Sequence, residues 1–222
     1  MATRQRHGRW YGDACGTAFA MELVGERWSL LIVRELLLGA CRFSDLRAVL
    51  GTISAKTLTE RLESLIDAGV VLRRVLPAPS RAQVYELTRW GYAAEPMIQE
   101  AGRWAAQSSG HDPTLPLSPV AFMISLRTMV DKRAVGKLKA KTIAFEIGRD
   151  SFIAEPAVAA LPIRRRTETD RADATLFAPS AGPLAALFYR KLSSDDAGVR
   201  IEGDRAVAQR FVDLFALPPK LA

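Results

Sequence analysis

The chain has 222 residues, of which 49% are hydrophobic, and a formal net charge of +7. This length predicts one large or two small domains with ordinary packed cores, and the positive charge favours polyanionic partners. Cys15 and Cys41 are too few for a secreted disulfide scaffold or a structural zinc site, and the sequence lacks both a membrane-spanning apolar run and the apolar centre of a signal peptide. We therefore expect a cytoplasmic globular protein without a structural metal or a membrane contact.

The chain is predicted to begin with an arm and a short helix. Residues 1–12 are polar and basic, which favours a frayed terminus over an arm that contacts DNA, and the aromatic residues near the start indicate docking on a partner. A helix is expected over residues 15–24. Cys15 lies at its N-terminus, where the helix dipole favours a reactive thiolate although Asp13 opposes it, and the alternative is a small buried core residue.

Further helices precede the central one. The first is expected over residues 26–38, and the next lies in RFSDLRAVLG at 42–51, with Ser44 as its N-cap. A short glycine-containing turn leads from there straight into another helix, which is the arrangement of a helix-turn-helix. The side chains expected to face the core from the helix at 42–51 are Leu46, Val49 and Leu50.

The central helix begins after Ser54, a natural N-cap, and ends near Gly69. Apolar residues recur on one face, at Leu58, Leu62, Leu65 and Ile66. At about 100° per residue, this stripe leaves the opposite side of the first turns polar, whereas Glu63 and Asp67 further along would repel phosphate. Only the N-terminal half of the helix is therefore expected to approach nucleic acid. The residues expected to do so are Ser54, Lys56, Thr57, Glu60 and Arg61.

A basic hairpin follows. The apolar period changes from helical to two over residues 71–75 and 83–87, which predicts two strands, and the prolines between them leave an exposed tip. This hairpin is expected to clamp DNA phosphates beside the helix, and the alternative is a helix-plus-hairpin unit with a solvated basic face. The residues expected to contact DNA from outside the helix are Arg42, Arg73, Arg74, Ser80 and Arg81.

After the hairpin, Thr88 is expected to cap a helix that runs to residue 107 with a kink at Pro96. Its many aromatic residues make it, with the first helix, a candidate homodimer surface, and packing on the chain's own second half is the alternative. Residues 108–118 are rich in proline and small polar residues, which predicts a linker. The expected division is a DNA-binding and dimerisation domain at 1–107, a linker at 108–118 and a second domain at 119–222.

The second domain is expected to cover a small sheet with helices, so the fold class is α+β. Helices are predicted at 119–132, 182–192 and from 204, and strands at 143–147, 151–155, 172–177 and 199–203, with 157–171 left ambiguous. Large apolar residues on the helices either line a pocket for an elongated apolar ligand or fill a solid core. They are Phe122, Met123, Leu126, Met129, Leu184, Leu187, Phe188, Phe211 and Phe215.

Several signatures of the first domain occur together: GERWSLLIVRELLLG at 25–39, RFSDLR at 42–47, ISAKTLTERLESLIDAGVV at 53–71 and YELTRWG at 85–91. In this order, residues 13–107 resemble the HxlR-type winged helix-turn-helix transcriptional regulators of bacteria. The resemblance implies a homodimer through the first and last helices of the domain, with DNA contacts from the helix after Ser54 and from the hairpin. Some members sense oxidants or electrophiles through a cysteine at the position of Cys15, whereas Cys41 is a departure with no expected role.

The second domain resembles sterol-carrier-protein-like lipid-binding domains in RADATLFAPSAGPLAALF at 171–188 and VRIEGDRAVAQRFVDLF at 199–215. This implies an apolar small-molecule effector. Residues 156–170 depart from the expected strand pattern, and the arginines at 164–166 are expected to be solvated rather than to clamp a ligand.

Catalytic motifs such as GxGxxG, the P-loop, HExxH, GxSxG and CxxC do not occur, so we expect neither an enzyme nor a cofactor. One function that remains is a dimeric transcription factor that binds an inverted repeat in double-stranded DNA and senses an apolar molecule, or an oxidant through Cys15. The other is a lipid-binding or scaffold protein whose winged helix contacts only proteins.

Overall fold

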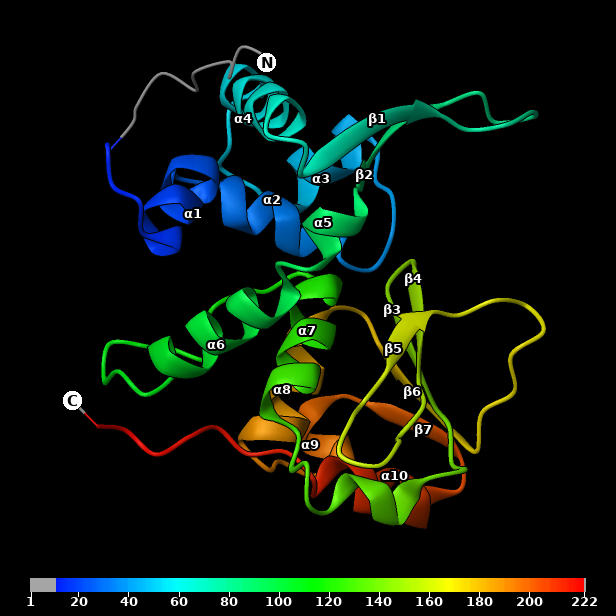
Figure 1. The fold of residues 1–222 in the computed structure, drawn as a ribbon. Helices are drawn as coiled ribbons and strands as arrows, with labels where there is room; N and C mark the ends of the chain where they lie inside the picture. The colour runs from blue at the N-terminus through cyan, green and yellow to red at the C-terminus, as the bar shows by residue number, and fades with distance from the viewer. Residues whose placement is uncertain (1–10, 222) are drawn as a thin grey trace. The chain divides into compact units, whose positions relative to one another are not determined.

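The computed structural model describes residues 11–221. The chain divides into two compact units, Met1–Ile98 and Gln99–Ala222 (Figure 1). The basic arm predicted for residues 1–12 lies outside the described residues except for its last two positions. None of the described helices combines the length and the apolar character that crossing a membrane requires.

The first unit contains a helical core and a two-stranded hairpin. Its elements are α1 (Gly16–Val24), α2 (Ser29–Leu36), α3 (Phe43–Val49), α4 (Ala55–Asp67), β1 (Val71–Val75), β2 (Gln83–Leu87) and α5 (Arg89–Tyr92), and α6 (Glu95–Ala105) spans the boundary between the units. This is the predicted winged helix-turn-helix order, with α3 and α4 as its helix pair and the β1–β2 hairpin as its wing.

Helix α4 forms as the sequence predicts. The Ser54 hydroxyl accepts a hydrogen bond from the Thr57 backbone N–H at 3.0 Å, which satisfies one of the donors that a helix start leaves unpaired. Leu58, Leu62 and Leu65 are fully buried. Gly69 follows with φ of +72°, a left-handed conformation that glycine adopts without a side-chain clash, and the chain leaves the helix there.

The two preceding helices differ in detail from the prediction. Helix α2 begins at Ser29 because Trp28 has a left-handed φ of +82°, which interrupts the helix expected from residue 26. Arg42, not Ser44, is the N-cap of α3, and Ser44 lies within its first turn. Val49 was expected to be buried but is 40% exposed, because α3 is short and only Leu46 and Leu50 reach the core.

The wing is held in register on both edges of β2. Strand β1 pairs antiparallel with β2, with Val71 opposite Leu87 and Arg74 opposite Val84. On the other edge, Cys41 exchanges both backbone hydrogen bonds with Tyr85, at 2.9 and 2.8 Å. This bridge ties the start of the helix-turn-helix to the wing.

Thr88 joins the wing to the helices on either side of it. Its hydroxyl donates to the Gly69 carbonyl at 2.7 Å and accepts from the Gly91 N–H at 3.0 Å, so it closes α4 and caps α5, as predicted. The single kinked helix expected after Thr88 is instead two helices separated at residues 93–94. Pro96 lies in the first turn of α6, where a missing N–H removes no helix hydrogen bond.

The second unit contains a five-stranded sheet in the order β5-β4-β3-β6-β7. Strands β3 and β6 are parallel, and all other neighbours are antiparallel. The elements after α6 are α7 (Pro119–Met129), η1 (Val135–Leu138), β3 (Ile143–Ile147), β4 (Asp150–Ala154), β5 (Ile163–Arg165), β6 (Ala174–Ala178), α8 (Ala181–Tyr189), α9 (Ser194–Ala197), β7 (Arg200–Gly203) and α10 (Arg205–Val212).

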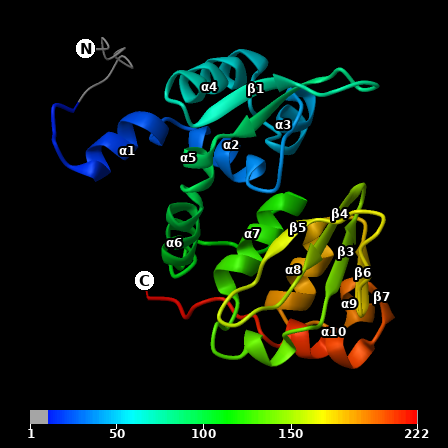
Figure 2. The ribbon, with the colours of Figure 1, turned by 45° about the vertical axis from the view of Figure 1, so that its right-hand side comes forward.

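The α+β class is confirmed, and the predicted helices and strands of this unit all form, with ends that shift by up to three residues. Helices α8 and α10 pack on β6, as Figures 1 and 2 show. Strand β5 lies in the segment left ambiguous, and the one-turn elements η1 and α9 were not predicted. Such short elements carry no complete helical or strand period and are held by packing.

Candidate nucleic-acid interface

The N-terminal half of α4 presents polar groups away from the core, as expected. The Lys56 side chain is 88% exposed, and its Nζ lies 3.9 Å from the Glu60 carboxylate one turn later. The Ser54 hydroxyl is engaged in capping and also lies 2.8 Å from the Thr57 hydroxyl. Lys56 is therefore the extended cation of this helix start, while Ser54 and Thr57 are held close to the backbone.

Arg61, which we expected at the flank of this surface, forms an ion pair within the first unit. Its Nη2 lies 3.5 Å from the Glu26 carboxylate, and its side chain is mostly buried. The Nε of Arg61 is buried without a hydrogen-bond partner. This arginine braces α4 against the turn before α2 and has little freedom to reach a ligand.

The two arginines of β1, Arg73 and Arg74, lie on opposite faces of the strand. Arg74 forms an ion pair with Glu86, its diagonal neighbour on β2, so part of its charge is neutralised. Arg73 is exposed on the other face and has no ion pair within residues 11–221. Because the side chains of successive strand residues point to opposite faces, a DNA duplex lying on one face of the wing contacts only one of these two arginines directly.

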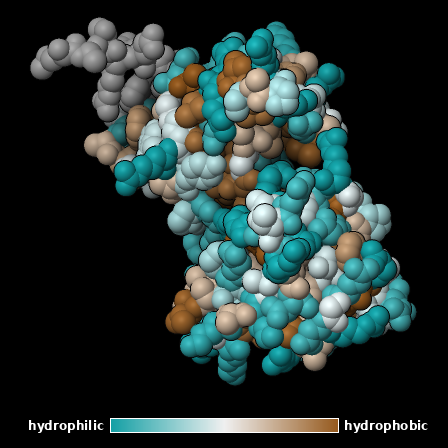
Figure 3. Space-filling view, turned by 90° about the vertical axis from the view of Figure 1, so that its right-hand side faces the viewer, coloured by the Kyte–Doolittle hydropathy of each residue, from teal (hydrophilic) through white to brown (hydrophobic). Residues whose placement is uncertain are grey.

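The tip of the wing is connected to α3. Arg42 Nη2 donates to the Ser80 hydroxyl at 3.2 Å, across a sequence separation of 38 residues. Arg81 beside it is exposed and, in the described part of the chain, without an ion pair. Arg42, Ser80 and Arg81 are thereby brought together at the tip. Figure 3, viewed from the side to which the hairpin points in Figure 1, shows hydrophilic residues interspersed with apolar ones on the first unit.

A buried carboxylate in the first unit was missed at the sequence level. Glu35 in α2 is 1% exposed, and its Oε1 accepts from Arg34 Nε at 3.0 Å and Arg34 Nη2 at 2.7 Å. Neighbouring Arg and Glu residues are common in surface helices, so this pair carries no signal of burial. The Arg34 guanidinium compensates the charge of the buried Glu35 carboxylate.

Cys15 is exposed at the N-cap of α1, so of its two alternatives the small buried core residue is wrong. The backbone N–H of Thr17, followed by that of Ala18, lowers the pKa of the Cys15 thiol because both can hydrogen-bond to the thiolate. Cys41 is half-buried, with Sγ 3.8 Å from the carbonyl oxygens of Glu35 and Gly39.

Exposed aromatic side chains lie on α5 and α6, the segment expected at a dimer interface. Trp90 and Tyr92 on α5 are partly exposed, and Trp104 on α6 is 77% exposed. Large aromatic side chains left in water are a common mark of protein interfaces.

The residues proposed to line an apolar pocket are packed against one another. All are buried except Met129, which is half-buried. The rings of Phe122, Phe145, Phe188, Phe211 and Phe215 form a continuous cluster with centroid separations of 5.0 to 6.4 Å. This arrangement is that of a filled core.

The arginine run of the second unit is neutralised by carboxylates. Arg164 binds Asp170 at 2.6 Å, Arg165 binds Asp150 at 2.7 Å and Arg166 binds Glu146 at 2.9 Å. Arg164 holds the pKa of the Asp170 carboxyl well below its usual range. These pairs connect strands β3 to β5 and the loop after them, so the run supports the sheet.

The HxlR-like helix-turn-helix family model matches residues 23–112, and residues 113–222 lie outside that match. The uncharacterized HTH-type transcriptional regulator YvaP of Bacillus subtilis is 40% identical over 88 residues, which are 40% of this chain and 82% of YvaP. The HTH-type transcriptional regulator YodB of the same organism is 39% identical over 88 residues, which are 40% of this chain and 79% of YodB. The structure of the reduced form of YodB has a TM-score of 0.41 and 35% identity, and covers 45% of this chain and 100% of that one. Since YvaP and YodB are matched over most of their own length, this chain belongs to the HxlR-like helix-turn-helix family.

Proposed function

We propose that this protein is a dimeric transcriptional regulator that binds an inverted repeat in double-stranded DNA. The observation that carries the proposal is the exposed Lys56 at the start of α4, in the same unit as a wing whose Arg73 and Arg81 have no ion pair within residues 11–221. A helix start that reads a groove beside cations that bind phosphate is the arrangement of winged-helix recognition. The names of the relatives YvaP and YodB as transcriptional regulators agree with it.

The ion pairs divide the candidate residues into two groups. Arg61 and Arg74 are held by Glu26 and Glu86, so they contribute less to phosphate binding than the sequence implied. Arg73 and Arg81, together with Arg42 beside Ser80, are the arginines available to DNA. Lys56 joins them because its pair with Glu60 is long, at 3.9 Å, and its side chain is 88% exposed. We assign phosphate contacts to the arginines and base-edge contacts to Lys56 and Thr57, with Glu60 setting the position of Lys56.

A dimer is part of the proposal because one recognition helix covers too few base pairs for specificity, and matched half-sites follow from two-fold symmetry. The exposed aromatic residues of α5 and α6 support an interface between copies. The division into a DNA-binding and dimerisation domain at 1–107, a linker at 108–118 and a second domain at 119–222 remains our proposal.

The sterol-carrier-like identity of the second domain and an apolar effector stay predictions. The sheet with helices α8 and α10 packed on β6 is compatible with such a domain, whereas the contacts among the phenyl rings favour a solid core. Native mass spectrometry for a co-purified lipid, and thermal shift with fatty acids, sterols and aromatic compounds, distinguish the two. Stabilisation by one of these classes would support the effector, and its absence from all of them would contradict it.

The proposed function is tested by the salt dependence of binding to duplex DNA. Genome-wide mapping of bound DNA in the source organism supplies the sites, and fluorescence anisotropy with one such duplex measures affinity at increasing salt. Phosphate contacts require log affinity to fall linearly with log salt. A protein that binds no mapped site, or binds with no salt dependence, would be a lipid-binding or scaffold protein whose winged helix contacts proteins.

A second candidate function is thiol-based sensing by the same regulator. It is favoured by the exposure of Cys15 and by the Thr17 and Ala18 N–H groups that lower the pKa of its thiol. Oxidation or alkylation there would add bulk or charge at the first turn of α1, which belongs to the expected dimer surface. We propose that this change weakens DNA binding through the dimer geometry.

A further inference from the structure

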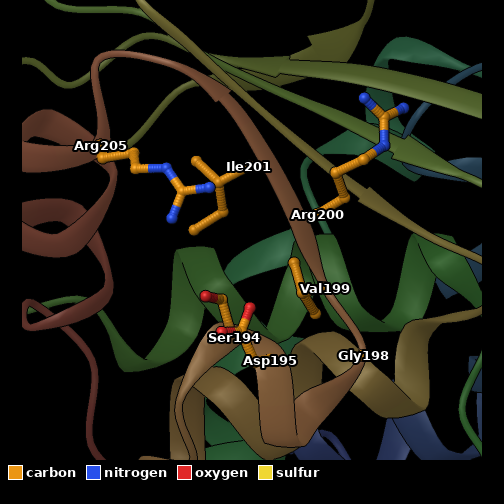
Figure 4. Close-up of a pocket in the computed structure, with 7 residues that line it drawn as sticks. All are labelled: Ser194, Asp195, Gly198, Val199, Arg200, Ile201 and Arg205. Carbon is orange, nitrogen blue, oxygen red and sulfur yellow. The ribbon is translucent and has the colours of Figure 1, made fainter.

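A pocket of about 360 Å³ lies at the edge of the second unit's sheet, between α9, β7 and the start of α10 (Figure 4). Small-molecule sites in proteins occupy roughly 300 to 1,000 Å³, so the volume suits a small metabolite rather than a long lipid. None of the apolar core residues predicted to bind a ligand lines this pocket. It is therefore a separate feature of the second unit.

Charges of both signs line this pocket, from Asp195, Arg200 and Arg205. In Figure 4 the Arg205 guanidinium extends from α10 on one side, and the side chains of Ser194 and Asp195 lie on the side formed by α9. Within residues 11–221, neither Arg205 nor Asp195 forms an ion pair or a side-chain hydrogen bond. On the opposite edge of the same sheet, by contrast, Arg164 of β5 is paired with Asp170.

The position of Arg205 is not explained by the stability of its helix. It is the first residue of α10, where the positive end of the helix dipole disfavours a cation. The neighbouring Asp204 carboxylate is occupied as the N-cap, accepting from the Val207 N–H at 3.0 Å. An anionic ligand group in the pocket would satisfy both the guanidinium and the dipole.

Arg200, the other arginine at the pocket, does not compete for such a group. Its guanidinium carbon lies 3.8 Å from the centre of the Phe177 ring, and the side chain pairs with Glu202. Figure 4 shows it directed away from Arg205. Arg205 is thus the cation of the pocket, and Asp195 is its carboxylate.

Apolar groups complete the lining. Ile201 from β7 is half-buried beside Arg205, and Val199 before it is buried. The backbone that carries them is fixed, since the Val199 N–H donates to the Ser194 carbonyl at 2.8 Å. The pocket therefore offers a guanidinium fork, a carboxylate with a neighbouring hydroxyl, and a short branched apolar surface.

We propose that this pocket binds a small zwitterion, an aliphatic α-amino acid. Its carboxylate binds the Arg205 guanidinium, whose fork matches a carboxylate in two hydrogen bonds. Its ammonium group donates to the Asp195 carboxylate and the Ser194 hydroxyl, and its side chain packs on Ile201 and Val199. Amino-acid binding at this pocket does not depend on DNA binding by the first unit. An experiment that contradicts one of these two proposals therefore leaves the other standing.

Isothermal titration calorimetry on the full chain tests the site with L-valine, L-leucine, L-isoleucine and L-methionine. We expect saturable binding of at least one of them, weakened about tenfold or more by Arg205→Ala and by Asp195→Asn, because each change removes a charge-assisted contact. For leucine, 3-methylbutylamine lacks the carboxylate and 4-methylpentanoate lacks the ammonium group, and both should bind correspondingly more weakly.

Matched controls lie on the same helices. Arg210→Ala on α10 and Asp196→Asn on α9 change charge outside the pocket and should leave binding intact. Thermal unfolding checks that each variant is folded, and Arg205→Lys provides a second variant that keeps the charge but loses the fork. No heat from any of the amino acids at millimolar concentration, or equal binding by Arg205→Ala, would overturn the site. Equal affinities for 4-methylpentanoate and leucine would show that the ammonium group is not recognised, which would contradict the assignment of a zwitterionic ligand.

Discussion

Arg42, the N-cap of α3, donates a hydrogen bond from Nη2 to the hydroxyl of Ser80 at the tip of the wing, at 3.2 Å. The contact connects the helix-turn-helix to the outermost part of the hairpin, which is otherwise supported near its base by the Cys41–Tyr85 bridge. Both side chains are exposed, so the hydrogen bond itself contributes little to stability. Its consequence is to place a cation beside Arg81.

Arg42→Ala and Ser80→Ala should therefore have different effects on DNA binding. Arg42→Ala removes a charge, and the slope of log affinity against log salt should fall by about one, since each phosphate contact contributes about 0.9. Ser80→Ala should weaken binding slightly and leave the slope unchanged. Fluorescence anisotropy over a salt series measures both, and equal slopes for wild type and Arg42→Ala would remove Arg42 from the interface.

Arg81→Ala should weaken binding to all sequences alike, whereas Arg74→Ala should have a smaller effect because Glu86 already pairs with Arg74. Glu86→Gln releases Arg74 and should raise affinity for unrelated duplexes. The control is Lys132→Ala with Arg133→Ala, an exposed basic pair in the second unit. An Arg81→Ala, Lys56→Ala double variant that binds as tightly as wild type would contradict the whole assignment.

Changes at Lys56 or Thr57 should alter the preference among sequences rather than affinity in general. A direct base contact discriminates by about 1 to 3 kcal/mol, which is a large change in a selection experiment. Selection of bound sequences from a random duplex library by wild type and Lys56→Ala compares the two. Thr57→Ser keeps the hydroxyl that lies 2.8 Å from Ser54 and separates a groove contact from helix capping.

Cys15 should react faster than an ordinary thiol at neutral pH. Its pKa is lowered by the Thr17 and Ala18 N–H groups, so the thiolate persists to lower pH, and the rate of alkylation by iodoacetamide should reach half its maximum at a lower pH than for an unperturbed exposed thiol. Mass spectrometry of the tryptic peptides follows Cys15 and Cys41 in one sample. If an oxidant releases DNA from Cys15→Ser as readily as from wild type, the thiol plays no part in sensing.

Phe188→Ala should destabilise the second unit by about 3 to 5 kcal/mol, the cost of removing a buried aromatic side chain. Phe188 contacts the rings of Phe122, Phe145, Phe211 and Phe215 and is fully buried. Urea unfolding measures the change. Trp104→Ala, on an exposed side chain, should change the monomer's free energy of unfolding by less than about 0.5 kcal/mol.

The sequence by itself determined the features whose causes lie close together in the chain. The Ser54 cap, the leucine stripe and Gly69 define α4 because each acts within a few residues. The hairpin and strands β3, β4, β6 and β7 were predicted from short runs of neighbouring residues, whereas β5 was not. Sequence patterns gave the wrong start for α2, because that start depends on one backbone angle. The left-handed φ of Trp28 moves the first helical residue to Ser29.

Only the tertiary structure decided which charged side chains are available to bind DNA and which are paired within the chain. Glu26 holds Arg61, Glu86 holds Arg74 and Ser80 accepts from Arg42, each across more than ten residues of sequence. The exposure of Cys15 and the pairing of Arg166 with Glu146, across 20 residues of sequence, are likewise set by what lies nearby in space. Residue type and spacing state the charge of a side chain, but the field around it depends on partners that the fold brings within about 4 Å.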